Sequence, residues 1–447
     1  MTQRERTRVN NRRLITVFVI VFIDLLGFGL ILPLLPFYAD NYGASAFVIG
    51  LLAASYAAAQ MVGAPVLGRL SDRHGRRPVL LVSIAGTAVG FLLLGLADPL
   101  GRWVAGLLPT SLVGDNLIAV TNALILGILF VSRILDGVTG GNISVAQAYI
   151  TDITDEENRA RGLGLIGAAF GLGFIIGPAA GGILSAGERY AVPAFFAAGL
   201  AALNWIGVLL WLPESLTAEI KAQLAKQPAR AILSARELWH ALQRPRFGPL
   251  LRIRLFYGLA FAAFTGVFAL YAQYRLGLDS QQTGFLLAYV GLLSVLVQGV
   301  AIGRLSKRFP ENRLIFGAVA ILAVSLLAWA FAPNVPVLLV VLAPLSFAAG
   351  VLNTVINSAI TKSVYPEEVG GALGFSASIE SLTRVIGPAA GGFVLGALGA
   401  WAPGVIGAVI MAWLISYVWR RLIVNPDPPL PSRGSKDPAM GSIQAQP

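Results

Sequence analysis

Five charged residues lie inside otherwise apolar stretches of this sequence, and their types and spacing offer acid–base chemistry. Arg133 and Asp136 are three residues apart, and Glu380 and Arg384 are four apart with the acid first. Residues three or four apart share a helix face, so each pair can form an ion pair. Asp24 has no basic residue within one helical turn. Charges in apolar surroundings are costly, so we expect these side chains to face the protein interior and to mark a functional site.

The composition around these charges excludes an ordinary soluble fold. Of 447 residues, 56% are hydrophobic and only 12% are charged, about half the usual share in globular proteins. The net charge is +11, which in a soluble protein would suggest nucleic acid as a partner. Most Lys and Arg residues instead fall on one predicted side of the membrane, as the positive-inside rule requires, so we expect no nucleic-acid binding.

Long charge-free runs predict the elements that position the charged residues. Each run is long enough to cross the hydrocarbon core, which takes about 20 helical residues. Lipid offers no water to backbone groups, and these runs do not alternate in polarity, so they favour helices over a barrel. The predicted spans are 14–39, 47–68, 79–97, 118–151, 162–185, 193–212, 250–272, 282–303, 314–331, 336–361, 371–396 and 402–422.

The chain divides into two predicted six-helix halves. We expect a cytoplasmic N-terminus at 1–13, an N-terminal bundle at 14–212, a cytoplasmic linker at 213–249, a C-terminal bundle at 250–423 and a disordered cytoplasmic tail at 424–447. The Lys and Arg distribution predicts a multi-pass protein of the cell (inner) membrane with both termini inside. Four charged linker residues are expected on short amphipathic helices at the membrane surface: Glu219, Lys221, Arg230 and Arg236.

Internal repeats support this division. The sequence IGPAAGG occurs at 176–182 and 386–392, and GRLS occurs at 68–71 and 303–306. The two motifs lie farther apart in the first half than in the second. The segment 98–117, predicted as an outer connection, accounts for these extra residues. The fold class is therefore an all-α membrane protein of twelve transmembrane helices in two pseudo-symmetric bundles. Duplicated halves of this kind predict a carrier that binds substrate near the midplane and rocks around it.

The loop between the second and third spans reads GRLSDRHGRR from Gly68 to Arg77. It resembles the signature of the major facilitator superfamily, which has the same fold of two six-helix bundles. The resemblance implies a cytoplasmic gate formed by Gly68, Asp72, Gly75, Arg76 and Asp152. In that family the loop Asp sits against the N-terminus of helix 11, and an Arg pairs with an Asp at the inner end of helix 4. The alternative is a solvated basic loop that only sets topology.

The fifth span resembles the motif of the twelve-helix drug:proton antiporters. Its residues Gly173, Gly177, Pro178 and Gly181 match that pattern. Small residues let helices approach closely, and proline removes one backbone hydrogen bond. A glycine-rich packing face without any bearing on transport direction is the alternative, and the second copy at Gly387 and Pro388 supports packing as much as function.

The first span, from Asp24 to Tyr38, resembles the first helix of the tetracycline-resistance branch. The segment Arg133 to Gly137 resembles that family's R-x-x-q-G motif, with Asp136 in place of a neutral residue. The resemblance implies proton coupling through Asp24 and Arg133, with Asp136 as a candidate partner of Arg133. Glu380 and Arg384 have no charged counterparts in the first half, so they are further candidates for proton coupling, and a neutralised structural pair is the alternative.

We expect Asp24 to lie near Arg133. Burial raises the pKa of a carboxyl group and a neighbouring guanidinium lowers it, so alternating access to Arg133 would let Asp24 bind and release a proton. The alternative is a fixed structural ion pair. The acidic residues expected in helices 3 and 9 of the tetracycline-resistance branch are missing, since 79–97 and 314–331 contain no charged residue.

Polar and aromatic residues of other spans are candidates for lining a substrate cavity. An aromatic series in span seven, which starts at Tyr257 and Phe261, can stack on a ring system or can simply be packing. The candidates are Tyr56, Gln60, Asn142, Gln147, Tyr257, Phe261, Gln298, Asn353 and Asn357.

These features predict a transporter and not an enzyme. The chain has no cysteine, only two histidines and no nucleotide-binding loop, so we expect no cofactor and no metal site. We expect proton-coupled efflux of small amphipathic organic compounds by a monomer in the lipid bilayer. Proton-coupled import of a sugar or another metabolite on the same fold is the alternative. The sequence leaves open the substrate, the number of protons and the use of sodium.

Overall fold

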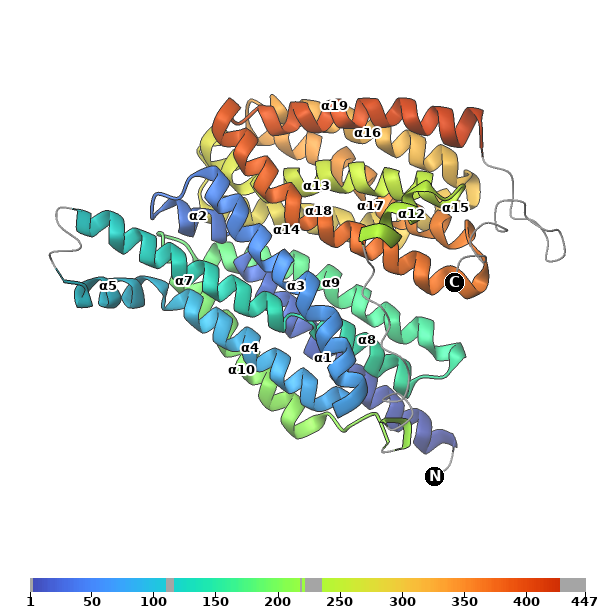
Figure 1. The fold of residues 1–447 in the computed structure, drawn as a ribbon, viewed down its shortest axis with the longest axis horizontal. Helices are drawn as coiled ribbons and strands as arrows, with labels where there is room; N and C mark the ends of the chain where they lie inside the picture. The colour runs from blue at the N-terminus through green and yellow to red at the C-terminus, as the bar shows by residue number, and fades with distance from the viewer. Residues whose placement is uncertain (1–2, 110–115, 218, 222–234, 427–447) are drawn as a thin grey trace.

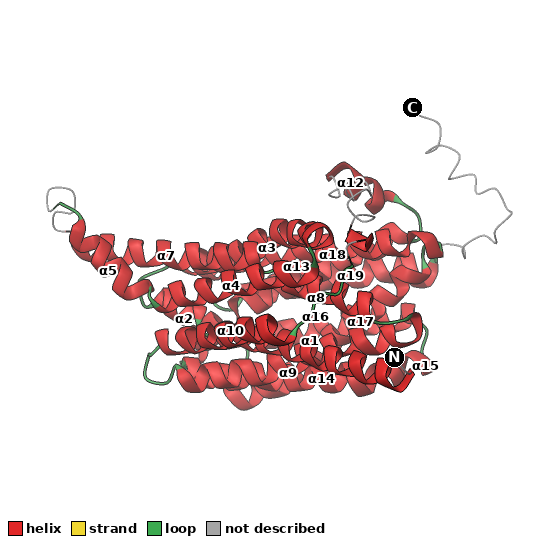
Figure 2. Cartoon of the chain, turned by 90° about the horizontal axis from the view of Figure 1, so that it is seen from below, coloured by secondary structure: helices red, strands yellow, loops and turns green. Residues whose placement is uncertain are grey.

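The computed structural model describes residues 3–109, 116–217, 219–221 and 235–426, and this part of the chain contains helices and no strand (Figure 2). Within it, twelve helical segments are long and apolar enough to cross a membrane. The predicted all-helical membrane fold is thereby confirmed.

The helices of the first six spans form one group in Figure 1, which we call the N half. They are α1 (Gln3–Ile31), α2 (Leu35–Asp40), α3 (Ala46–His74), α4 (Arg76–Gly95), α7 (Leu117–Thr139), α8 (Asn142–Ile153), α9 (Glu156–Leu184) and α10 (Ala191–Trp211). The first span is interrupted next to Pro33, which has no backbone N–H to donate. The fourth is interrupted at Gly140 and Gly141, between α7 and α8.

The last six spans form the C half. They comprise α13 (Phe247–Leu276), α14 (Ser280–Leu296), the π-helical η2 (Val297–Ala301), α15 (Ile302–Arg308), α16 (Glu311–Ala330), α17 (Val335–Lys362), the short η3 (Pro366–Glu368), α18 (Val369–Leu398), α19 (Ala402–Val418) and the π-helical η4 (Trp419–Val424). Side chains cap several helix starts. Asp279, for example, accepts a hydrogen bond from the backbone N–H of Gln282 at 2.8 Å, and Gln282 reciprocates in a capping box.

Among the described residues, α5 (Ala97–Leu107) and α12 (Ala235–Gln243) are helices outside the predicted spans, and residues 219–221 of the linker are helical too. The sequence predicts a connection at 98–117, but α5 is helical and packs against α7. Within this helix, the Arg102 guanidinium forms an ion pair with the Asp98 carboxylate one turn earlier, with an Nε to Oδ1 distance of 2.9 Å. In the linker, α12 carries Arg236 as predicted. Arg230 and most of the predicted tail lie outside the described residues.

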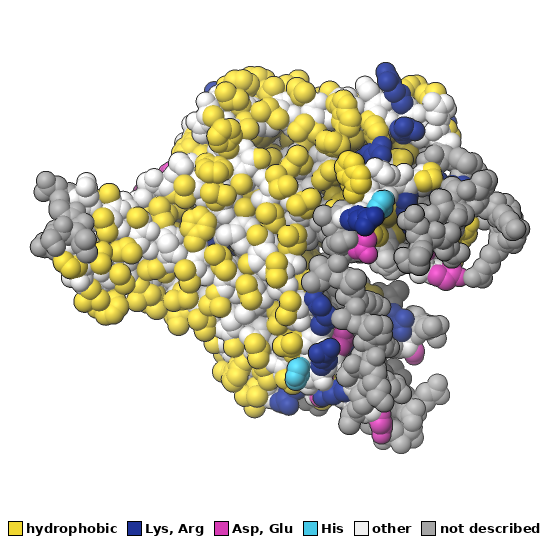
Figure 3. Space-filling model, viewed as in Figure 1, with side chains coloured by type: hydrophobic (Ala, Val, Ile, Leu, Met, Phe, Trp, Pro, Cys, Tyr) yellow, Lys and Arg dark blue, Asp and Glu magenta, His cyan; other side chains and the backbone are white. Residues whose placement is uncertain are grey.

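The surface of the described residues matches a membrane protein. Large apolar side chains such as Val62, Leu203 and Val340 are exposed. Figure 3 shows hydrophobic side chains in yellow over most of the visible face, with Lys and Arg gathered mainly at the end of the molecule that carries the Gly68–Arg77 loop. We call that end the even-loop face, because it carries the loops after even-numbered spans, and the opposite end the odd-loop face.

The two halves meet toward the odd-loop face. Asp40 accepts hydrogen bonds from Gln273 at 2.8 Å and from Tyr274 at 2.7 Å across the halves. The hydroxyls of Ser185 and Ser280 lie 2.8 Å apart at the same end. In Figure 1 the helices of the two halves diverge toward the even-loop face, where the N-terminus lies. The two halves are therefore closed against each other at the odd-loop face and separate toward the even-loop face.

Candidate functional site

The first charge cluster lies in the N half. Arg133 and Asp136 project from the same face of α7, and their side chains approach to 3.2 Å as the spacing predicts. Both side chains are at most 5% exposed. The Arg133 guanidinium also lies over the Phe91 ring, 5.4 Å from its centroid. Arg133 is therefore held by one carboxylate and one aromatic face.

Asp24 on α1 completes this N-half charge cluster, but with a different partner from the expected Arg133. Its carboxyl group lies within hydrogen-bonding reach of Asn142 on α8 and within electrostatic range of Asp136. The guanidinium is instead held by Asp136, because that residue shares the α7 face with Arg133. The cluster thus holds two carboxyl groups and one guanidinium, and Asp24 has no ion pair among the described residues.

Tyr56 and Gln60 on α3 connect the N-half cluster to the other half. The Gln60 amide donates to the Tyr56 hydroxyl and to the Gly140 carbonyl, both at 3.0 Å. The Tyr56 ring packs against Phe28, with centroids 5.3 Å apart. Its hydroxyl group interacts electrostatically with the N-half cluster and also with Arg384 of the C half. Tyr56 therefore lies within electrostatic range of both clusters.

The second cluster lies in the C half and includes a residue that sequence reasoning missed. Glu380 and Arg384 pair along α18 at 2.6 Å, as predicted. Glu380 also accepts a bond from Arg254 on α13, which is buried. Arg254 further donates to Asn353 at 2.9 Å. Its position four residues inside the predicted seventh span is a usable signal, but its neighbour Arg252 makes it resemble an interfacial anchor.

A cavity of about 220 Å³ lies between the two halves. It is lined from α3 by Ala57 and Gln60 and from α18 by Ala377, Glu380, Ser381 and Arg384. We call it the central cavity. Because both halves contribute to it, their relative movement must change its shape.

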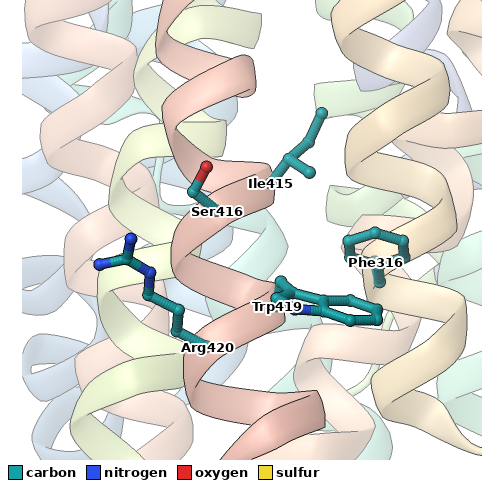
Figure 4. Close-up of a pocket in the computed structure, with 5 residues that line it drawn as sticks. All are labelled: Phe316, Ile415, Ser416, Trp419 and Arg420. Carbon is teal, nitrogen blue, oxygen red and sulfur yellow. The ribbon is translucent and has the colours of Figure 1, made fainter.

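A larger pocket of about 480 Å³ lies elsewhere, between α16 and the end of the twelfth span. In Figure 4 the Trp419 indole faces Phe316, while Arg420 points away from that ring. All its lining residues belong to the C half, and it shares none with the charge clusters. It is not the candidate substrate site.

The remaining residues predicted to line the cavity lie in different surroundings: some make polar contacts between helices, some are exposed and some are buried in the core. Asn357 accepts a hydrogen bond from Ser376 at 3.1 Å, which links α17 to α18. Gln147 and Gln298 are exposed and have no described contact with either charge cluster. Tyr257 is buried, and its hydroxyl donates to the Ala349 carbonyl at 3.2 Å, which fits the packing alternative.

The aromatic series of span seven is mainly core packing. Phe261 stacks on Tyr257 with centroids 5.8 Å apart. Further along α13, Phe264 and Tyr271 pack against the fully buried Trp329 at 4.7 and 4.4 Å. We therefore do not retain this series as a ring-binding wall.

The signature loop at the even-loop face centres on Arg76. This guanidinium reaches Asp152 at 3.0 Å, as the resemblance implies, and it also reaches Asp72 at 2.5 Å. Glu214 accepts hydrogen bonds from the first backbone N–H groups of α4, including that of Arg76 at 2.9 Å. Gly75 adopts φ +110°, which favours glycine.

Asp72 does not contact the start of helix 11 in this structure. Its described ion pair is with Arg76 of its own half, and its side chain is 41% exposed. The expected contact between halves is therefore absent among the described residues. The reason is geometric, since the halves diverge at this face and meet at the other.

The glycine motif of span five packs in two directions. A Cβ at Gly177 would lie 2.7 Å from the Cα of Gly29 on α1, so the motif glycines seat α9 against α1 within the N half. On the opposite side, a Cβ at Gly182 would lie 2.9 Å from the Gln281 carbonyl on α14 of the C half. Gly173 and Gly181 likewise face Leu25 and Leu30 of α1.

The second copy of the motif packs in the same way. Gly387 and Gly391 face α13 of their own half, whereas Gly392 faces Ala46 on α3 of the N half. Both copies therefore join the first helix of their own half to a helix of the other half. Packing is the role that this geometry supports for the motif.

Comparison with known proteins identifies relatives over nearly the whole chain. The sequence model of the Major Facilitator Superfamily matches this chain over residues 17–333 and 253–445. Tetracycline resistance protein, class D, of Salmonella ordonez is 31% identical over 415 residues, which cover 91% of this chain and 93% of that protein. Solute carrier family 22 member 18 of Rattus norvegicus is 29% identical over 424 residues, 95% of each chain.

Solved structures share the fold. The human organic anion transporter MFSD10 is 23% identical, with a TM-score of 0.62 over 92% of this chain and 99% of that one. The nucleoside transporter NupG is 15% identical, with a TM-score of 0.67 over 91% of this chain and 99% of that one.

Proposed function

Since the chain belongs to the Major Facilitator Superfamily, in its tetracycline-resistance-like antiporter branch, we propose that it exports small amphipathic organic compounds in exchange for protons. The coarser statement, a multi-pass membrane transporter, follows from the family and the twelve spans. The proposal adds the direction of transport, the coupling ion and the class of substrate.

The position of Asp24 carries the proposal. It is a carboxyl group in a membrane span without a described ion pair, beside a second carboxyl group that already holds the one guanidinium of its cluster. Keeping such a group ionised in a span costs about 2.5–3.5 kcal/mol on insertion scales. Neutralisation by a proton removes that cost, so Asp24 is the group we assign to proton binding, with Arg133 and Asp136 setting the field around it.

Alternation of access follows from the two faces. The halves are closed against each other at the odd-loop face by Asp40 and by Ser185 with Ser280. Closure at the other face would bring Asp72 toward α18 and open the odd-loop face. The Lys and Arg residues at the even-loop face favour a cytoplasmic position for that face, at the inner membrane. We propose that one chain suffices, because both walls of the central cavity belong to it.

The driving force is sufficient for efflux. One proton that moves inward down 100 mV supplies about 2.3 kcal/mol. By the relation between free energy and concentration ratio, this supports about a fortyfold gradient of a neutral solute.

Everted membrane vesicles that carry the protein test this proposal. A pH-sensitive dye reports an imposed proton gradient while a panel of amphipathic compounds, a tetracycline among them, is added one by one. Transported compounds should dissipate the gradient in wild-type vesicles. Asp24→Asn should abolish the response at equal protein level, and Asp155→Asn, at an exposed helix cap, should not change it.

Two results would overturn the proposal. One is an unchanged response in Asp24→Asn, which removes this residue from coupling. The other is uptake of the active compounds into intact cells driven by an inward proton gradient, which indicates import.

A further inference from the structure

The C-half charge cluster holds more positive than negative charge. Arg254 and Arg384 share a single carboxylate, Glu380, and each bonds a different oxygen of it. The other polar partner of Arg254 is the neutral Asn353. One guanidinium suffices to neutralise Glu380, so the cluster carries one positive charge in excess. The N-half cluster shows the opposite balance when its acids are ionised.

The two guanidiniums differ in exposure, and this difference assigns their roles. The Arg254 side chain is 4% exposed and is fixed by two bonds. The Arg384 side chain is 60% exposed and lines the central cavity with one described ion-pair partner. A guanidinium has five N–H donors in a planar fork. Arg384 therefore presents free donors to the cavity, while Arg254 holds Glu380 in place.

The N-half residues that line the cavity carry no charge. Ala57 and Gln60 line that side of the cavity. The Gln60 amide nitrogen is already committed to Tyr56 and Gly140. In the N-half cluster, Asp136 is paired with Arg133 and Asp24 lies beside Asn142, and neither carboxyl group is part of the cavity lining. The described cavity lining thus offers a guanidinium with no second carboxylate facing it.

We propose that Arg384 binds an anionic group of the substrate: a carboxylate, sulfonate or phosphate. Arginine binds such groups through paired, charge-assisted hydrogen bonds. The anion and the proton then bind to different walls, the anion to the C half and the proton to the N half. This inference names the substrate class of the site and rests on the proposed function for the statement that the bound compound is transported.

The absence of cysteine from the chain provides a clean test. Ser381→Cys places a thiol in the cavity lining, one turn from Arg384. Its rate of modification is measured in detergent with the anionic sulfonatoethyl methanethiosulfonate and with the cationic trimethylammonioethyl methanethiosulfonate, each relative to a free thiol. The anionic reagent should be favoured. Adding Arg384→Gln should lower the ratio of the anionic to the cationic modification rate about tenfold. Coulomb's law gives an effect of this size for a charge one helical turn from the thiol.

Two matched variants control for structural effects. Arg384→Lys keeps the charge and should keep the ratio. Arg304→Gln removes an exposed guanidinium of α15 outside the cavity and should leave the ratio unchanged. A ratio that favours the cationic reagent, or one that Arg384→Gln does not change, overturns the proposal.

A second measurement tests binding of the anionic group itself. Naphthalene sulfonate and its uncharged partner naphthalene sulfonamide are compared for protection of Ser381→Cys against a small neutral thiol reagent. Protection by the sulfonate alone, lost in Arg384→Gln, supports the site, whereas equal protection by both compounds, or by neither, contradicts it. Neither measurement requires transport, so a protein that fails the proton test can still pass this one, and the two failures are distinguishable.

Discussion

Glu380 is the residue on which the C-half charge cluster depends. It is the one described carboxylate that contacts both Arg254 and Arg384, and Arg254 is buried in the helix bundle. Removing one partner of a buried ion pair leaves an uncompensated charge, which costs far more than the pair contributes.

We therefore expect Glu380→Gln to destabilise the protein by on the order of 3 kcal/mol. Thermal unfolding in detergent measures this. Arg254→Met combined with Glu380→Gln should recover most of the loss, since no buried charge then remains. Arg384→Gln alone should change stability little because its side chain is exposed. A single Glu380→Gln variant as stable as wild type contradicts the buried cluster.

Asp155 gives a prediction about pH outside the membrane spans. Its side chain caps α9 and accepts hydrogen bonds from the backbone N–H and the side-chain amide of Asn158, at 2.9 and 2.8 Å. These bonds hold the pKa of Asp155 below its ordinary value. A lowered pKa in the folded state stabilises the fold above the ordinary pKa, and this contribution disappears as the pH falls through the lowered value.

Asp155→Ala should accordingly lower the thermal midpoint at neutral pH, and the difference from wild type should narrow as the solution is acidified. Asp155→Asn keeps a capping side chain that does not titrate, so its difference from Asp155→Ala should persist in acid. A wild-type advantage over Asp155→Ala that grows in acid would contradict the capping role.

At the scale of single residues, spacing predicts contacts within a helix and misses contacts between helices. The Arg133 to Asp136 and Glu380 to Arg384 pairs follow from positions three and four apart. The partner of Asp24 and the bond from Arg254 to Glu380 depend on how separate helices rotate and pack. No local pattern in the sequence determines that rotation.

At the scale of elements, the paired glycine motifs determine how the first helix of each half is seated. Gly177 approaches Gly29 so closely that no side chain fits between α9 and α1. We expect Gly177→Ala to destabilise the protein by about 1–3 kcal/mol, as overpacking does. Gly167→Ala is the matched control, because a Cβ there would meet no neighbouring atom within 4 Å and alanine favours a helix. Thermal midpoints of the two variants in detergent measure the difference, and equal midpoints contradict close packing.

Helices are predictable where the apolar run is long, and less so elsewhere. All twelve spans follow from length and hydropathy alone. Helix α5 is missed because the residues from Ala97 to Leu107 include a proline, two glycines and two charges, which together are typical of a connection. The helix packs against α7, and this tertiary contact overrides the weak local preference.

At the scale of the whole molecule, closure at the odd-loop face can be tested by a covalent link. Ser185→Cys with Ser280→Cys places two thiols where the native hydroxyls lie 2.8 Å apart. Mild oxidation should join them and stop transport, and a reductant should restore it. Each single variant should be insensitive to oxidation. Full transport by the linked protein would show that this face does not need to open.

The division into halves is readable from the repeats, whereas the state of the carrier is not. The duplicated motifs indicate two similar bundles. The same sequence is compatible with closure at the odd-loop face and with closure at the even-loop face, and it does not indicate which of the two conformations the protein adopts. The partners of Asp40 at one face and of Asp72 at the other report that state, and both arise from relative placement of the halves.

The central claim is that Asp24 couples proton movement to substrate movement. It is tested most directly by comparing two activities of Asp24→Asn in vesicles, with a compound that wild-type protein transports. Exchange of labelled for unlabelled compound needs no proton gradient, and we expect the variant to retain it. Accumulation driven by a proton gradient should be lost. Gradient-driven accumulation at the wild-type level in this variant would contradict the claim.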